Sequence, residues 1–318
     1  AETCAVSASA APAQPVDMYE HAEAIDISGR IPPTLYESLA SPKWKDRKEA
    51  LDALLGAIRV PRIQESHTGL ISALSNALCA RVASDANVLV VASAAQCLEA
   101  LALGLRKAFA PLKNDAMGVL LERCKEKNRA VVEALRGALD ALVYAIQSLS
   151  DLFAGDPPLL QPFTAHKNPQ VRAETMLFAS RLLPRIFRQG PNAKRDTKAV
   201  CTLLLPLLDD SVPEVREAAT SLAAGLIQVA GSQAVLPFMD GVDKLKLAKI
   251  TAKAAESQPA PNAAQPAPAT QATMTKPAAT ATDRAPAVSK PTMQPSAAIS
   301  DKRPPSASSS ASATPGSS

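Results

Sequence analysis

The feature of this sequence that most constrains its fold is an internal repeat. Five segments in the middle of the chain each open on a polar turn that often holds Pro or Asn, and each then continues into a long amphipathic helix. A shorter apolar stretch precedes every turn, so the repeating unit is a pair of helices. Such a unit cannot bury its apolar face alone and must stack on its neighbours. Aligned on Arg47, Val88, Val131, Val171 and Val215, the segments lie 41, 43, 40 and 44 residues apart.

Helix pairs that recur at this interval are typical of HEAT and armadillo repeats. The composition agrees, because Ala and Leu dominate and only 3% of the residues are aromatic, whereas strands favour β-branched and aromatic side chains. We therefore predict an all-α fold, a HEAT-repeat α-solenoid with disordered N- and C-terminal flanks. The stretch "SQAVLPFMDGVDKLKLAKI" (232–250) follows the fifth pair and is predicted to cap the stack.

The flanks separate from the repeats by composition. Residues 1–24 are rich in Ala, Ser and Pro and show no periodicity, whereas residues 25–251 carry the helical pattern. Residues 252–318 form a Pro/Ala/Ser/Thr-rich tail that cannot bury enough apolar surface to offset its ordering entropy. We predict that this tail is a disordered, weakly basic linker. The chain opens on Ala1 and not on Met, which leads us to expect a piece of a longer protein.

Several functional classes find no support in the sequence. The motifs GxxxxGK[ST], GxGxxG, GxSxG and HExxH do not occur, so we expect neither an enzyme nor a cofactor. No apolar run approaches the roughly 20 residues that span a bilayer, so no membrane partner is expected. The net charge of +4 falls short of the dense basic face of a nucleic-acid binder. No metal site is expected, because the only three histidines do not lie at ligand spacing to the five cysteines, four of which fall within apolar helical patterns.

The turns between paired helices are the best candidates for a functional site. In a stacked solenoid these turns line up along one edge, and four of the five offer Lys or Arg. The only tryptophan of the chain, Trp44, lies in the first turn between two lysines, where a rigid indole makes a good binding anchor. The five turns are Pro42-Lys43-Trp44-Lys45, Ser84-Asp85-Ala86-Asn87, Glu126-Lys127-Asn128-Arg129, His166-Lys167-Asn168-Pro169 and Asp210-Ser211-Val212-Pro213, the last of which is followed by Glu214 and Arg216.

Two simpler interpretations stand beside this one. An indole near a helix start can fold back on the preceding helix as a hydrophobic staple. Basic residues at helix starts can also be ordinary solvated surface. The functional interpretation rests on the row of turns and not on any single residue.

The segments "SPKWKDRKEALDAL", "KNPQVRAETMLF", "SVPEVREAA" and "VDKLKLAKI" resemble a TOG domain. Over about 225 residues the chain is most similar to the second TOG domain of the ch-TOG/Minispindles family of microtubule polymerases. CLASP proteins carry related domains, but the "VDKLKL" segment favours the polymerase family. This resemblance implies a paddle of six HEAT repeats whose turn edge binds the curved αβ-tubulin heterodimer.

The resemblance also implies a role for each turn. The first three turns would lie on β-tubulin and the last two on α-tubulin, and Trp44 would be the β-tubulin anchor. The second turn departs from the family pattern, because it holds "SDAN" where relatives often have a basic residue. The tubulin-binding residues implied in this way are Trp44, Lys45, Asn87, Val88, Lys127, Lys167, Asn168 and Arg216.

The resemblance further implies microtubule plus ends as partners and additional TOG domains in the parent protein. The expected location is the cytoplasm and its microtubules, including spindle poles and the centrosome. Two other functions stay open from the sequence: a CLASP-type microtubule stabiliser, and a general HEAT scaffold that binds another protein on the inner helices of the solenoid instead of the turns.

Overall fold

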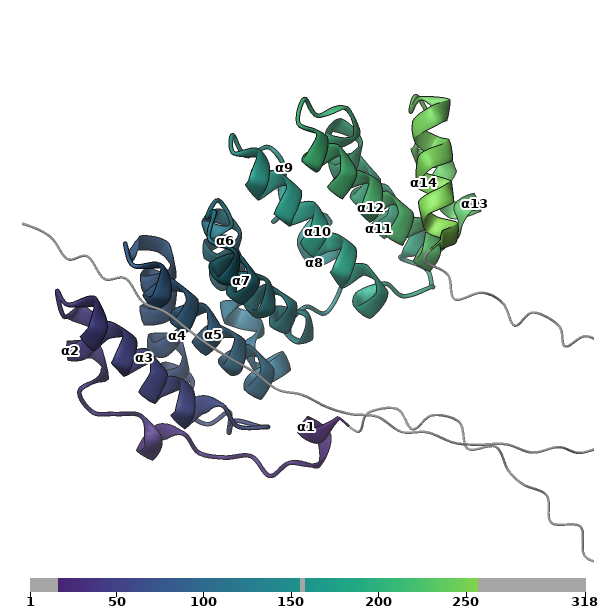
Figure 1. The fold of residues 1–318 in the computed structure, drawn as a ribbon. Coiled ribbons are helices and arrows are strands. Elements are labelled where there is room, and N and C mark those ends of the chain that lie inside the picture. Colours follow the sequence, from purple (N-terminus) through teal and green to yellow (C-terminus); the bar gives the residue numbers. More distant parts are fainter. Residues whose placement is uncertain (1–16, 155–157, 257–318) are drawn as a thin grey trace, which may run out of the picture. The chain divides into compact units, whose positions relative to one another are not determined.

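The computed structural model describes residues 17–154 and 158–256, and within them every regular element is helical (Figure 1). The predicted all-α class is therefore confirmed. The helices that pair into repeats are α2 (Leu35–Ala40) with α3 (Trp44–Ile58), α4 (Thr68–Ser84) with α5 (Val88–Leu105), α6 (Lys113–Arg123) with α7 (Arg129–Ala141), α8 (Ser150–Phe153) and α9 (Gln161–Thr164) with α10 (Pro169–Ile186), α11 (Ala193–Leu204) with α12 (Pro213–Ala230), and α13 (Ser232–Val235) with α14 (Lys244–Glu256).

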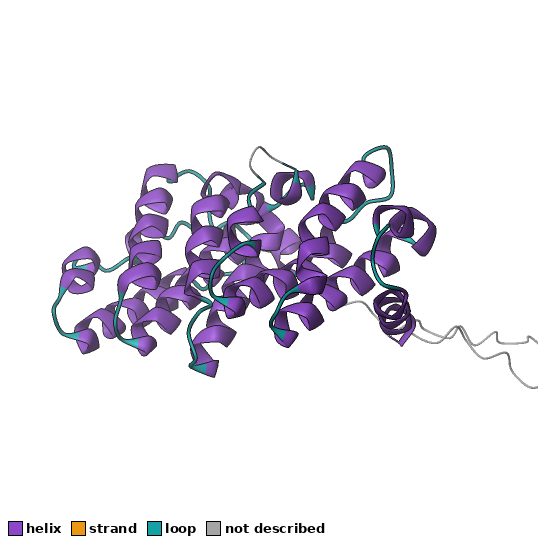
Figure 2. Ribbon diagram, turned by 90° about the horizontal axis from the view of Figure 1, so that it is seen from above, coloured by secondary structure: helices purple, strands orange, loops and turns teal. Residues whose placement is uncertain are grey.

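The helices form two layers. The second helices of successive pairs pack against one another, α3 on α5, α5 on α7, α10 on α12 and α12 on α14. The first helices form the other layer, in which α4 packs on α6 and α11 on α8. Figure 2 shows the same helices from above, joined by short loops. The α-solenoid prediction is confirmed, and the weakest joint between second helices lies between α7 and α10.

The core consists of aliphatic side chains from both layers, and it includes the four cysteines that fall within apolar helical patterns. Cys79, Cys97, Cys124 and Cys201 are buried free thiols. Cys4 lies outside the described residues. Burial raises the pKa of the Cys79 thiol to about 11 and that of the Cys97 thiol to about 12.

One stretch corrects the sequence analysis on apolar runs. Val88–Arg123 contains a window of mean hydropathy 1.9 that has the length and composition of a membrane span, and 67% of that window is buried inside the fold. The expectation that no run approaches this length is therefore wrong. A HEAT core helix such as α5 is packed on several sides, so it carries few charged residues.

The structure corrects the alignment of the first two repeats. Val131, Val171 and Val215 are all buried third residues of their helices, but the matching residues in α3 and α5 are Asp46 and Val90, not Arg47 and Val88. Arg47 instead occupies the fourth helical position, like Arg172 in α10 and Arg216 in α12. The apolar pattern could not reveal this because the third and fourth positions of α3, Asp46 and Arg47, are both charged.

The fourth and sixth repeats also differ from the predicted pattern. The apolar stretch at 157–166 forms only the single-turn helix α9, with α8 as a separate turn before it. Pro158 and Pro162 provide no backbone N–H, which prevents one continuous helix. The predicted cap is a sixth, shortened helix pair, because α14 packs along α12 as the other second helices do.

The ordered body extends beyond the predicted bounds of 25–251. The short helix α1 (Met18–His21) lies against the end of α5, where Asp17 accepts two hydrogen bonds of 2.6 Å from Arg106. At the other end, α14 continues to Glu256. The boundary at residue 24 therefore falls too late, because the contact that holds this segment joins residues 89 positions apart. The rest of both predicted flanks, 1–16 and 257–318, lies outside the described residues.

Candidate binding edge

The turns that precede α3, α5, α7, α10 and α12 lie along one edge of the helix stack, as Figure 1 shows. We call this surface the turn edge. The turn before α14 continues the same row. The predicted alignment of the turns is thus present, and side chains hold each turn both internally and against the next one.

The second, fourth and fifth turns use the same local device. A polar side chain two residues before the N-cap accepts a hydrogen bond from the N-cap N–H: Asp85 from Asn87 at 2.9 Å, and Asp210 from Val212 at 2.9 Å. His166 accepts in the same way from Asn168 at 3.0 Å. This bond replaces one that water would otherwise provide and fixes the direction in which the chain enters the helix.

An arginine at the fourth helical position connects the first turn to the second, and another connects the fourth turn to the fifth. Arg47 donates from Nε and Nη2 to the Asp85 carboxylate at 2.7 and 2.8 Å, and its Nη1 donates to the carbonyl of Ser41 in its own turn. Arg172 repeats this pattern with the carboxylate of Asp210 at 2.8 and 2.9 Å. Each guanidinium therefore closes its own turn and binds the following one through a two-pronged charge-assisted contact.

Other side chains join the remaining turns. Arg123, at the end of α6, donates from Nη2 to the carbonyl of Asp85 at 3.0 Å and so links the third turn to the second. Gln170 donates to the carbonyl of Glu126 at 2.6 Å, which links the fourth turn to the third. Lys246 of α14 contacts Asp209 beside the fifth turn. Direct hydrogen bonds therefore connect all six turns in sequence, and the edge is held in register along its length.

The two bridging carboxylates are held ionised by these contacts. The hydrogen bond from Arg172, together with the Val212 N–H, lowers the pKa of Asp210 from its ordinary value. Burial alone would raise the pKa of Asp85, but the hydrogen bonds from Arg47 and the Asn87 N–H outweigh it, so this pKa is also lowered. Both side chains thus stay charged where the arginines need them.

Four of the predicted site residues lie exposed on the turn edge. Trp44 is 38% exposed and is not part of the core cluster, unlike an indole folded back as a staple. Lys45, Lys127 and Lys167 are exposed at the first, third and fourth turns. These four side chains are available to a partner.

The other four are partly covered and contribute to the fold. Asn87 and Asn168 are N-caps whose side chains accept hydrogen bonds of 2.9 Å from Leu89 and Gln170 N–H. Val88 packs against the core. Arg216 closes its own turn by donating from Nη1 to the Asp210 and Ser211 carbonyls at 2.7 and 3.0 Å. The structure therefore gives each of them a structural role, whatever else they contact.

Sequence reasoning missed two exposed apolar residues on this edge. Leu89, at the second position of α5, is 48% exposed, and Leu245, at the second position of α14, is 82% exposed. Both lie in the first turn of a helix. A large apolar residue at the second helical position was the signal that would have identified them.

Beside the turn edge, the α7–α10 joint leaves a groove of about 640 Å³. Arg136 of α7 crosses it to bind the buried carboxylate of Glu174 on α10, with Nε to Oε2 at 2.8 Å.

Among the residues that the structure describes, no group of three His, Cys, Asp or Glu side chains is placed to hold a metal ion. The turn edge therefore presents exposed basic side chains together with a few exposed apolar ones, a combination suited to binding a protein surface.

Residues 33–252 match the family model described as the TOG domain of XMAP215/Dis1/CLASP. The chain is 34% identical over 234 residues to the spindle pole body component alp14 of Schizosaccharomyces pombe, an alignment that covers 74% of the chain and 28% of that relative. It is 36% identical over 236 residues to Protein mini spindles of Drosophila melanogaster, covering 74% of the chain and 11% of that relative. The alignments thus span less than a third of the length of either relative.

Solved structures give the same result. One described as "Structural Basis of Microtubule Plus End Tracking by XMAP215, CLIP-170 and EB1" matches with a TM-score of 0.66 and 34% identity, covering 74% of this chain and 95% of that one. Another, described as "Structural Basis of Tubulin Recruitment and Assembly by Microtubule Polymerases with Tumor Overexpressed Gene (TOG) Domain Arrays", matches with a TM-score of 0.66 and 26% identity, covering 77% and 49%.

Proposed function

The chain belongs to the XMAP215/Dis1/CLASP family of TOG domains, and because of this membership we propose that its turn edge binds the αβ-tubulin heterodimer. The observation that carries the proposal is the row of six hydrogen-bonded turns with Trp44 exposed at its first turn. A similar solved structure concerns tubulin recruitment by microtubule polymerases, which supports the same partner.

The exposed residues divide along the edge as the family resemblance implies. Trp44, Lys45 and Lys127 belong to the first three turns and would contact β-tubulin. Lys167 belongs to the fourth turn and would contact α-tubulin. Asn87, Val88, Asn168 and Arg216 would act mainly by holding the turns in shape, with their exposed atoms in contact with the partner.

A fixed edge gives the binding its selectivity. Because side chains tie each turn to the next, the strip does not adapt freely to a partner of different curvature. It would bind the curved, free heterodimer better than straightened tubulin in the lattice, so incorporation at a plus end would release it. This cycle depends only on the difference in affinity between the two shapes of tubulin, and the chain does not need to break a covalent bond.

The parent protein is proposed to act as a microtubule plus-end polymerase. Its relatives include a spindle pole body component and a mini spindles protein, which supports action in the cytoplasm at microtubules, spindle poles and the centrosome. Further TOG domains in the parent would raise the local concentration of tubulin near the growing end. One domain by itself is expected to bind tubulin and to promote growth poorly.

The test is co-elution with purified αβ-tubulin in gel filtration, followed by affinity measurement. The triple variant Trp44→Ala, Lys45→Ala, Lys127→Ala removes exposed side chains without touching a hydrogen bond between turns. We expect the wild-type chain to co-elute and the variant to lose at least about 2 kcal/mol of binding free energy, roughly a 30-fold rise in Kd. Arg216 is left intact because its removal would open the fifth turn.

The matched control is Arg185→Ala, Arg188→Ala, which removes two positive charges at the C-terminal end of α10, away from the turn edge. It should bind tubulin like the wild type. If the triple variant binds undiminished while the chain still binds tubulin, the contact lies elsewhere, as on the inner helices of a scaffold. If the wild-type chain does not bind tubulin at all, the proposed partner is wrong.

A further inference from the structure

The edge formed by the C-terminal ends of the second helices of the pairs carries an alternating series of arginines and tyrosines. The Arg106 guanidinium lies 4.0 Å from the centroid of the Tyr19 ring and 4.4 Å from that of the Tyr144 ring. Arg62 lies over Tyr19 at 5.4 Å, and Arg185 lies over Tyr144 at 5.7 Å. Cations over aromatic faces attract them, so this edge is organised around guanidinium groups.

The part of this stack around Arg106 already binds the N-terminal segment of the chain itself. Asp17 accepts two hydrogen bonds of 2.6 Å from Arg106, and Tyr19 covers the same guanidinium. Arg106 has a φ of +47°, which a residue with a side chain rarely adopts, so the backbone is strained at this residue. An acidic residue and an aromatic residue two positions apart are therefore what this arginine recognises.

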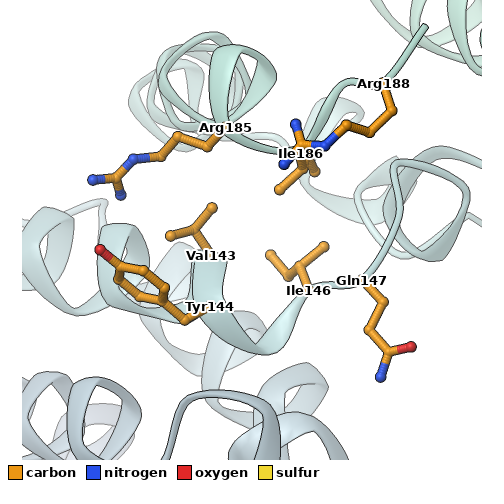
Figure 3. A pocket seen from close by; sticks show the side chains of 7 residues that line it. All are labelled: Val143, Tyr144, Ile146, Gln147, Arg185, Ile186 and Arg188. Atoms are coloured by element: carbon orange, nitrogen blue, oxygen red, sulfur yellow. The ribbon is translucent and has the colours of Figure 1, made fainter. Parts of the chain in front are cut away.

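The outer part of the stack opens onto a pocket of about 380 Å³ between the end of α7 and the end of α10. Figure 3 shows Arg185 and Tyr144 at one end of the pocket, Gln147 at the other, and apolar side chains between them. The apolar side chains are Val143, Ile146 and Ile186, and Arg188 completes the lining.

The two arginines of this pocket have no carboxylate partner among the described residues. Arg185 donates to the Asp140 carbonyl at 3.5 Å, and Arg188 donates to the Phe187 carbonyl at 2.9 Å. The neighbouring Arg181, by contrast, is paired with the Asp140 carboxylate at 2.9 Å. The pocket thus presents two uncompensated charges beside an apolar floor.

We propose that this pocket binds an acidic linear peptide of a partner protein that carries an aromatic side chain near its carboxylates. The carboxylates would pair with Arg185 and Arg188, and the ring would cover the apolar floor beside Tyr144. The binding of Asp17 and Tyr19 at Arg106 is the same chemistry within the chain. The pocket lies at the ends of the helices away from the turn edge, so this site is independent of tubulin binding.

The test uses a fluorescein-labelled random copolymer of Glu and Tyr in an anisotropy titration at physiological salt. We expect the double variant Arg185→Ala, Arg188→Ala to bind it at least about tenfold more weakly than the wild type, because two charge-assisted contacts are lost. The control Lys127→Ala, Lys167→Ala removes equal charge from the turn edge and should change the affinity less than about twofold. Polyglutamate without Tyr should bind more weakly than the copolymer.

Three results would overturn the proposal. The first is equal affinity of wild type and double variant for the copolymer, with melting temperatures showing both folded. The second is an equal loss in the turn-edge control, which would make the binding a matter of net charge. The third is binding of heparin that depends on the same arginines as strongly, which would make the pocket a general anion site. Tubulin binding should be unchanged in the double variant in every case.

Discussion

At the scale of single residues, the sequence indicates exposure better than it indicates contacts. Trp44 and its neighbouring lysines are exposed because the first turn lies at the edge of the helix stack, as the repeat pattern predicted. The bracing role of Arg216 was not predictable. Its partners are backbone carbonyls, which every residue has, so no side-chain pattern identifies them.

The buried thiols give a prediction at this scale. In a Cys4→Ser background we expect the remaining four cysteines to resist Ellman's reagent at pH 8 in the native protein and all to react in guanidinium. With a pKa of about 11, as for Cys79, on the order of one thiol in a thousand is ionised at that pH, against roughly one in four for a free cysteine. The absorbance of released thionitrobenzoate measures the reaction. A native thiol that reacts within seconds would contradict the packing described for the core.

At the scale of elements, the helix pairs were predictable and their fine register was not. The second helices follow the predicted segments closely, because the N-cap residues Asn87, Asn128 and Asn168 mark where α5, α7 and α10 begin. The shared fourth-position arginine was hidden, since α5 and α7 carry Val91 and Val132 at that place. Its partner lies 38 residues away, beyond any local pattern.

The Arg172–Asp210 bridge predicts how stability depends on pH. The pKa of Asp210 is lower in the folded chain than in the unfolded chain, so its contribution is complete above about pH 4 and is lost as the pH falls through the folded value. We expect Asp210→Asn to lower the free energy of unfolding by about 3 kcal/mol at pH 7, because it leaves a largely buried guanidinium without its counter-ion and replaces one acceptor oxygen by an amide donor. The difference from wild type should shrink below pH 4. Urea unfolding followed by circular dichroism measures both.

An exposed ion pair provides the matched control for that experiment. Arg129 and Glu133 are paired at 2.8 Å with side chains 89% and 56% exposed. Glu133→Gln should therefore change the free energy of unfolding by less than about 0.5 kcal/mol at any pH. If Asp210→Asn behaves like Glu133→Gln, the bridges between turns do not hold the edge.

At the scale of the whole described body, the main difference from the sequence-based expectation is the N-terminal segment. Residues 17–24 look like low-complexity flank, and only the stacking of the helices brings Arg62, Arg106 and Tyr144 together to receive them. A version of the chain that begins at residue 25 leaves the Arg106 guanidinium without its carboxylate. We expect it to melt about 2–4 °C below a version that begins at residue 17, as measured by differential scanning calorimetry.

The outcome of that comparison decides where the domain begins. A version that begins at residue 17 should melt with the full chain, since it keeps the contacts of Asp17 and Tyr19 with Arg106. Equal melting of the versions from 17 and from 25 would show that the contact with Arg106 adds nothing to the fold.

The lone indole at the first of six turns makes the two ends of the strip unlike. A partner built from two similar halves can then dock in only one direction, because reversing it would bring the indole against the wrong half. Every such module would present its cargo with the same end leading, which is what growth of a filament with distinguishable ends requires. The position of one side chain would thus set the direction of assembly.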